Sequence, residues 1–203
     1  MRSQAKAELV VKRSRFIGYV CPVKSGDEAI AFVNEIRARH RDATHNVYAY
    51  RVSKDNLSRY SDDGEPQGTA GLPVLEVITK PELTDCAIVV TRYFGGVLLG
   101  TGGLVRAYGE TASLAVREGV RVVMSLCSHM EINCDYSFYG RIPSLAASSD
   151  AQVTDTAFTD GVKVSLILPC EKEQYLQKQL TELSCGRFSA EKVGESYCET
   201  GTF

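Results

Sequence analysis

The sequence predicts an α+β protein made of two modules. Segments with strand-like alternation and segments with helical periodicity follow one another along the 203 residues, a length above the commonest size of a single domain. The charge is also divided, because residues 1–120 carry a net charge of +2 and residues 121–203 one of −4. This pattern indicates two modules whose net charges have opposite signs. We expect their boundary near residues 121–128, with domains spanning residues 1–124 and 125–203.

The composition is that of an ordinary soluble globular protein, with 44% hydrophobic and 24% charged residues. No run approaches the length of a membrane span, and the first residues lack the apolar core of a signal peptide. We therefore expect a cytoplasmic protein without membrane contact. The seven cysteines are scattered and form no CxxC pair, so we expect reduced packing thiols and no structural zinc.

The first module is expected to begin with a strand over residues 16–23. Ser25 then has the character of an N-cap for a helix over residues 26–41, with acidic residues in its first turn and arginines in its last. The arginines either form a solvated helix end or bind an anion. Residues 45–52 alternate like a strand, and residues 53–57 are typical of a polar turn.

The centre of the first module is a strand between two glycine-rich turns. Residues 72–79 fit either a strand or a short helix, and Pro81 ends them. Residues 86–90 are continuously apolar, which favours a strand buried on both faces, and a helix over residues 103–118 follows. Glycine clusters usually mark backbone that needs a positive φ or a close approach. Eight of the 17 glycines lie in these two turns, at positions 64, 68, 71, 95, 96, 100, 102 and 103.

The second module has a different order of elements. A strand over residues 129–136 precedes a helical segment at residues 139–149. Two strands then share residues 151–169 and turn at residues 159–161, before a helix at residues 171–183 and a last strand at residues 190–199. This β-α-β-β-α-β order predicts a ferredoxin-like sandwich, in which two helices cover one face of the sheet.

The second glycine turn is a candidate anion site. A buried strand ends just before it and a helix begins after it, so free backbone N–H groups and the positive helix end would face the same place. The arginines would add charge-assisted hydrogen bonds, and the aromatic rings would stack a nucleobase. Alternatively, the glycines serve close packing and the rings belong to the core. The candidate residues are Arg92, Tyr93, Phe94, Gly95, Gly96, Gly100, Thr101, Gly102, Gly103 and Arg106.

The first glycine turn gathers carboxylates. Such a cluster can hold magnesium near a bound phosphate, or it can cap and hydrogen-bond the turn backbone. Both interpretations stay open, and no metal is assigned. The residues concerned are His45, Arg59, Asp62, Asp63, Gly64 and Glu65.

Motifs of known catalytic chemistry are missing from the sequence. It contains no GxxxxGK[ST] phosphate loop, no GxSxG and no HExxH, and the second turn does not fit GxGxxG. Spacing alone identifies no nucleophile beside His40, His45 or His129. The residues therefore predict no catalytic group and no cofactor.

Four segments of the first module carry a family resemblance: KRSRFIGYV (residues 12–20), DATHNVYAYR (42–51), SDDGEPQGTAGLPVLEV (61–77) and VVTRYFGGVLLGTGGLVRAY (89–108). On these segments the sequence resembles the IMPACT family, in particular its bacterial YigZ-like branch. The last two segments are the longest and the most unusual. Beyond residue 125 the likeness is one of element order and length.

This resemblance implies two domains. The N-terminal domain would have the ribosomal protein S-five domain-two-like fold, shared with a domain of elongation factor G and with glycine-loop small-molecule kinases. The C-terminal domain would be ferredoxin-like, similar to the last domain of elongation factor G. Eukaryotic relatives regulate translation with an additional N-terminal domain that this sequence lacks, so their role is not implied in full. For bacterial members the family implies a nucleic-acid- or ribosome-associated role, with no catalytic role for the motif residues.

The sequence therefore predicts a non-enzymatic regulator that binds RNA, the ribosome or a translation-associated protein through the second glycine turn. Because the second module is acidic, the first module is expected to make the contact. Two alternatives stay open. One is a phosphate- or nucleotide-handling enzyme that uses both turns, and the other is a protein-interaction adaptor. The oligomeric state is not predicted.

Overall fold

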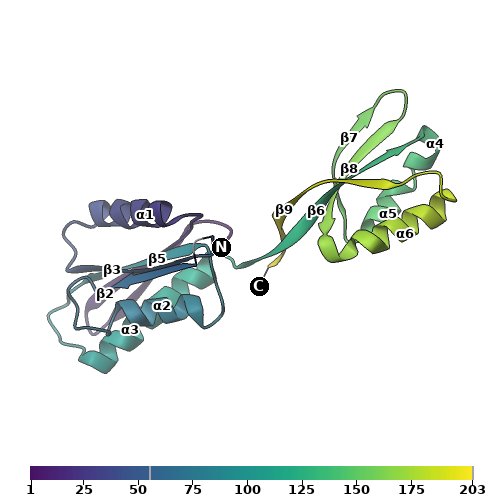
Figure 1. Ribbon diagram of the computed structural model, residues 1–203. Coiled ribbons are helices and arrows are strands. Elements are labelled where there is room, and N and C mark those ends of the chain that lie inside the picture. The colour runs from purple at the N-terminus through teal and green to yellow at the C-terminus, as the bar shows by residue number, and fades with distance from the viewer. Residues whose placement is uncertain (55, 203) are drawn as a thin grey trace. The chain divides into compact units, whose positions relative to one another are not determined.

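The computed structural model describes residues 1–54 and 56–202, which form two compact units (Figure 1). The first unit spans residues 1–121 and the second residues 122–202, and each has its own sheet and hydrophobic core. The predicted two-domain α+β class is confirmed. The division falls between Arg121 and Val122, slightly before the boundary expected after residue 124.

The first unit is a five-stranded antiparallel sheet between two helical layers. Its strands have the order β1-β2-β5-β3-β4. Helix α1 covers one face, and helices α2 and α3 cover the other (Figure 1). The strands are β1 (Ala5–Val11), β2 (Ser14–Pro22), β3 (His45–Val52), β4 (Leu57–Ser61) and β5 (Cys86–Tyr93), and the helices are α1 (Gly26–Arg39), α2 (Gly71–Thr79) and α3 (Thr101–Glu118).

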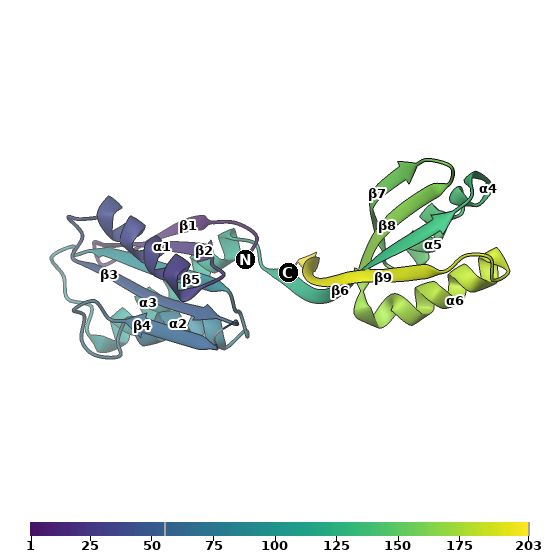
Figure 2. The same cartoon turned by 45° about the horizontal axis from the view of Figure 1, so that its top comes forward.

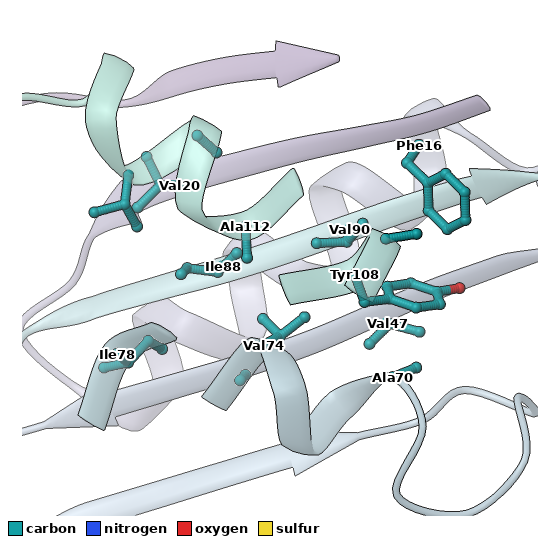
Figure 3. Close-up of a cluster of buried hydrophobic side chains, with 14 of the residues drawn as sticks. Phe16, Val20, Val47, Ala70, Val74, Ile78, Ile88, Val90, Tyr108 and Ala112 are labelled. Carbon is teal, nitrogen blue, oxygen red and sulfur yellow. The ribbon is translucent and has the colours of Figure 1, made fainter. Parts of the chain in front are cut away.

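Strand β5 lies at the centre of this sheet and is buried on both faces, as its apolar run predicted. Val90 belongs to the core under α2 and α3, together with Phe16 and Tyr108 (Figure 3). Val89 belongs to the separate core under α1. Alternate residues of one strand thus hold the helical layers on opposite faces of the sheet.

Two strands of the first unit, β1 and β4, were missing from the expectation, and one ambiguous segment is now assigned. Strand β1 was not predicted, and it forms an edge strand with alternating half-buried and exposed residues. The expected polar turn at residues 53–57 is the β3–β4 connection, and β4 begins already at Leu57; Asp55 lies outside the described residues. The ambiguous residues 72–79 belong to helix α2.

The second unit is a four-stranded antiparallel sheet of order β7-β8-β6-β9 (Figure 2). The predicted ferredoxin-like fold is confirmed, although β6 begins earlier than expected and β9 ends later. The strands are β6 (Val122–Cys134), β7 (Gln152–Phe158), β8 (Val162–Pro169) and β9 (Ala190–Thr202); the helices are α4 (Tyr136–Tyr139), α5 (Ile142–Ser148), η1 (Cys170–Lys172) and α6 (Glu173–Ser184).

The cysteines are all free, and Cys86 illustrates the packing role expected for them. It is fully buried in β5, and burial raises the pKa of its thiol to about 12. Such a thiol stays protonated and inert at neutral pH. Among the described helices, none has the length and apolar character needed to span a bilayer.

Candidate functional site at one end of the N-terminal sheet

Four connections of the first unit meet at one end of its sheet. The strand register places there the tight turn between β1 and β2 (residues 12–13), the loop before β3 (40–44) and the loop after β4 (62–70), together with the loop after β5 (94–100). We call these four loops, with Thr101–Gly103 at the start of α3, the sheet end. Both glycine turns of the sequence therefore belong to one surface.

An ion pair inside the protein joins the two turns. Arg92, the next-to-last residue of β5, is 5% exposed, and its Nη1 lies 2.5 Å from Glu65 Oε1 in the first turn. The hydroxyl of Tyr108 on α3 donates a hydrogen bond of 2.8 Å to the same oxygen. Burial first, and then the charge of Glu65, raise the pKa of Tyr108, so its hydroxyl keeps its proton and remains a donor.

The remaining contacts of Arg92 hold neighbouring segments. Its Nη2 lies 3.5 Å from Ser14 Oγ, which also accepts a 3.2 Å hydrogen bond from the backbone N–H of Gly95. The guanidinium stands 5.5 Å from the ring centroids of Phe16 and Phe94. Within the described residues, its Nε has no hydrogen-bond partner. All of these contacts of Arg92 are made inside the protein. Through Ser14 and Gly95 they hold the second turn in place.

The carboxylate of Asp62 caps helix α2. Its Oδ1 accepts hydrogen bonds from the N–H groups of Ala70 (3.0 Å) and Gly71 (2.8 Å), and its Oδ2 accepts one from Gly68 (2.9 Å). These donors would otherwise be unsatisfied at the helix start, where a negative charge also suits the helix dipole. This remote cap explains why residues 72–79 form a helix without a capping side chain at Ala70.

Asp63 ties the first turn to α1 and β3. Its Oδ1 accepts from Arg37 Nη2 at 2.6 Å, and its Oδ2 accepts from the Asn46 N–H at 2.7 Å. Its backbone carbonyl accepts from His45 Nδ1 at 2.7 Å, so that nitrogen carries the proton. The other ring nitrogen of His45 lies 3.8 Å from Glu65 Oε1.

The expected carboxylate cluster is therefore divided among local partners. Within the described part of the chain, Asp62, Asp63 and Glu65 form no group with metal-binding spacing. Gly64 has a φ of +88°, which glycine adopts without strain. Arg59 is exposed on β4, opposite Tyr50 in the strand pairing.

Glycine is present at the positions of the second turn for different structural reasons. A Cβ on Gly95 would come within 2.1 Å of the Arg13 carbonyl oxygen, so this glycine allows two backbones to touch. Gly96 and Gly100 have φ values of +80° and +73°, and a Cβ there or on Gly102 would meet nothing within 4 Å. Close packing thus explains Gly95, and positive φ explains Gly96 and Gly100, whereas the anion-site interpretation stays a prediction.

Helix α3 begins with open backbone donors. Gly100 is its N-cap and offers no side-chain hydrogen bond, and the first helical N–H bonded to the chain is that of Leu104, to Gly100 O. The N–H groups of Thr101, Gly102 and Gly103 have no partner among the described residues. Arg106 is exposed one turn further on, with its Nε 3.2 Å from the carbonyl oxygen of Gly102.

Three cations at the sheet end lie outside the two predicted glycine turns, although Arg41 belongs to the arginine-rich helix end for which anion binding was one interpretation. Lys12, Arg13 and Arg41 are exposed and make no ion pair with any other described residue. Lys12 and Arg13 occupy both positions of the β1–β2 turn, with φ values of 44° and 69°. Only the folding of the β1–β2 hairpin brings this pair to the glycine turns, and β1 was not visible in the sequence.

Exposed apolar side chains accompany these charges. Phe94 is 47% exposed and Leu98 is 82% exposed. Tyr93 is held differently, because its hydroxyl lies 2.8 Å from His40 Nδ1 and donates to Asp42 Oδ1 at 3.1 Å. Of the two predicted aromatic residues, Phe94 is therefore the more exposed one.

The structure thus defines a class: a two-domain α+β protein with loops of mixed charge and glycine-rich backbone at one end of its N-terminal sheet. Comparison with known proteins finds two domain models that match this chain. The Impact N-terminal domain model matches residues 12–116, and the domain of unknown function DUF1949 matches residues 132–187. The chain belongs to the IMPACT family, and the resemblance seen in its motifs is confirmed.

Bacterial relatives match most of the chain. IMPACT family member YvyE of Bacillus subtilis (strain 168) is 34% identical over 200 residues, which cover 98% of this chain and 92% of the relative. IMPACT family member YigZ of Escherichia coli (strain K12) is 34% identical over 179 residues, or 87% of this chain and 88% of the relative. A crystal structure described as that of a hypothetical protein is 30% identical, covers 96% of each chain and has a TM-score of 0.56.

Proposed function

We propose that this protein is a non-enzymatic regulator that binds RNA, free or within the ribosome, through the sheet end of its N-terminal domain. The observation that carries the proposal is the grouping of unpaired cations with open backbone donors. Lys12, Arg13 and Arg41 have no ion pair with the described residues. At the same sheet end, the first N–H groups of α3 have no hydrogen-bond partner among those residues.

Phosphate suits both kinds of donor. Backbone N–H groups at a helix start bind anions through hydrogen bonds and the helix dipole. Exposed lysine and arginine side chains neutralise phosphates along a nucleic-acid backbone and release its counterions. Most carboxylates of the sheet end already accept hydrogen bonds from Arg37, Arg92 or backbone N–H groups. They therefore form no ion pairs with the three exposed cations.

The apolar side chains of the same loops would contact bases. A ring that is about half exposed, as in Phe94, offers a face on which an unpaired base can stack, and Leu98 adds apolar surface beside it. Such contacts tolerate any base sequence. We therefore propose recognition of single-stranded or looped RNA by its backbone and its base faces.

Arg92 has a positioning role in this proposal. Its guanidinium is buried and paired with Glu65, so it holds the second turn in place and leaves the phosphate contact to exposed groups. Arg106 is exposed above the first turn of α3 and stays a proposed contact. A phosphate-handling enzyme is less well supported, because Asp62 and Asp63 have their oxygens engaged by backbone and arginine donors.

The regulatory part of the proposal rests on family membership. The IMPACT resemblance implies that eukaryotic relatives control translation. A sheet end that binds RNA or the ribosome would allow this protein to act on translation directly. The N-terminal domain is the part that would make the contact, since it carries the positive charge of the chain.

The test compares two triple variants of equal charge change. Lys12→Gln, Arg13→Gln and Arg41→Gln together remove the cations of the sheet end, whereas Lys24→Gln, Lys54→Gln and Lys178→Gln remove three exposed cations elsewhere. Binding to a fluorescent single-stranded RNA and cosedimentation with bacterial ribosomes are measured. The first triple should weaken binding at least about tenfold, or about 1.4 kcal/mol, more than the second. Equal binding by both triples, or no binding by the wild type, would overturn the proposal.

A further inference from the structure

A second surface of the N-terminal domain has the features of a binding groove. It lies between α2 and α3, has a volume of about 550 Å³ and is lined by residues of both helices, among them Pro73, Val77, Val105, Gly109 and Arg117. None of its lining residues belongs to the sheet end. We propose that this groove binds a short amphipathic helix that carries an acidic residue, supplied by a partner protein.

The shape of the groove suits a helix. On α3 the lining residues Val105, Gly109, Ser113 and Arg117 follow one another at intervals of four, so they form one stripe along the helix. At 1.5 Å per residue, this stripe is about 18 Å long. A groove between two helices with apolar lining residues is the arrangement in which peptide helices are bound.

Gly109 keeps the floor of the groove low. A glycine inside a helix costs roughly 1 kcal/mol of stability relative to alanine. The fold does not require it here, because an added Cβ would meet only Pro73 Cβ, at an ordinary 4.0 Å. By contrast, a Cβ on Gly18 would stand 2.8 Å from the carbonyl oxygen of Thr111. The absence of a side chain at residue 109 therefore serves the open surface, and packing does not explain it.

The charge of the groove indicates an acidic partner. Glu76 is the acidic lining residue, and Lys80 already pairs with it at 2.7 Å. Arg117 is exposed at the end of the stripe and makes no ion pair with another residue that the structure describes. Arg121 also lines this end. An acidic residue beside aliphatic ones would therefore complement the groove in both charge and shape.

The experiment uses the full chain as the target for selecting displayed random peptides. The peptides have about 12 residues, because a helix of that length matches the stripe on α3. Each round is counter-selected on Gly109→Leu, which fills the groove. Enriched peptides should combine aliphatic residues at helical spacing with Asp or Glu. Their affinity should fall at least about tenfold with Gly109→Leu and with Arg117→Glu, and should be unchanged with Lys24→Glu on the α1 side.

Arg117→Glu is the second, independent variant, because it changes an exposed side chain and leaves the packing of Gly109 untouched. The proposal is wrong if no peptide survives counter-selection, if the enriched peptides lack acidic residues, or if both variants bind them like the wild type. It is also wrong if Arg117→Glu reduces binding of the single-stranded RNA as strongly as peptide binding, since the groove would then serve RNA. RNA binding that is lost only with the sheet-end triple leaves the two surfaces separate.

Discussion

Arg92 and Glu65 form a buried ion pair between two glycine-rich turns that lie 27 residues apart in the sequence. Both side chains are almost entirely removed from solvent, and Tyr108 and Ser14 supply further hydrogen-bonding partners. The pair makes one surface out of two turns. The stability of the sheet end and its proposed binding role therefore depend on the same contact.

Removal of one partner of this pair should be costly. Glu65→Ala leaves a buried guanidinium without its counter-charge, and we expect a loss of about 3–5 kcal/mol in the free energy of unfolding. Tyr108→Phe removes only the neutral donor to the same carboxylate and should cost less, about 1.5–3 kcal/mol. Urea denaturation of both variants measures the difference. A Glu65→Ala loss no larger than that of Tyr108→Phe would contradict a buried pair.

The cap on α2 should be measurable separately. Asp62→Ala removes the acceptor of three backbone N–H groups and should lower stability by about 1–2 kcal/mol. Asp62→Asn keeps one acceptor oxygen, which can still serve Ala70 and Gly71, and should lose less. Denaturant midpoints of the two variants test the order. If Asn is as damaging as Ala, the charge of Asp62 matters more than its hydrogen bonds.

Stability should decrease in mild acid through His40. Burial, and after it Arg39, lower the pKa of this histidine below its usual 6.5, and its ring nitrogens contact Tyr19 and Tyr93. Because the folded pKa is the lower one, the unfolded state binds the proton more readily. The stabilisation is full above pH 6.5 and decreases as the pH falls through 6.5 toward the lower folded value. The melting temperature as a function of pH should lose this component in His40→Gln; an unchanged profile would count against it.

Two glycines of the second turn should respond in opposite ways. Gly96 has a φ of +80°, so Gly96→Ala forces an unfavourable backbone and should cost about 1 kcal/mol or more. Gly102 lies in the first turn of α3 with open space around it, so Gly102→Ala should not lower stability. Thermal denaturation separates the two. RNA affinity should fall with Gly102→Ala, because the new methyl group stands beside the open N–H groups; unchanged affinity would place the phosphate elsewhere.

The sequence was sufficient where the signal is local. The apolar run of β5 and the N-cap at Ser25 predict their elements, and Ser25 Oγ does accept the Glu28 N–H at 3.2 Å. Strand β1 was missed because it begins with Ala, Lys and Glu residues, which have low strand propensity, and because as an edge strand it has no fully buried apolar run. Helix α2 was ambiguous because Asp62, which caps it, lies eight residues before Ala70.

The site could be predicted only in part, for the same physical reason. Glycine clusters mark unusual backbone from sequence alone, whereas the Arg92–Glu65 pair depends on the alignment of β5 with β3, where His45 faces Arg92. The cations Lys12 and Arg13 enter the site only once β1 and β2 form their hairpin. Contacts that depend on strand register across the sheet carry no signature in local spacing.

The most direct test of RNA binding by the sheet end is the salt dependence of affinity. A plot of log K against log salt concentration for single-stranded RNA has a slope of about −0.7 per phosphate contact. Lys12→Gln, Arg13→Gln and Arg41→Gln together should make the slope shallower by about 2, whereas the control triple at Lys24, Lys54 and Lys178 should leave it near the wild-type value. Parallel lines for all three proteins would contradict the account.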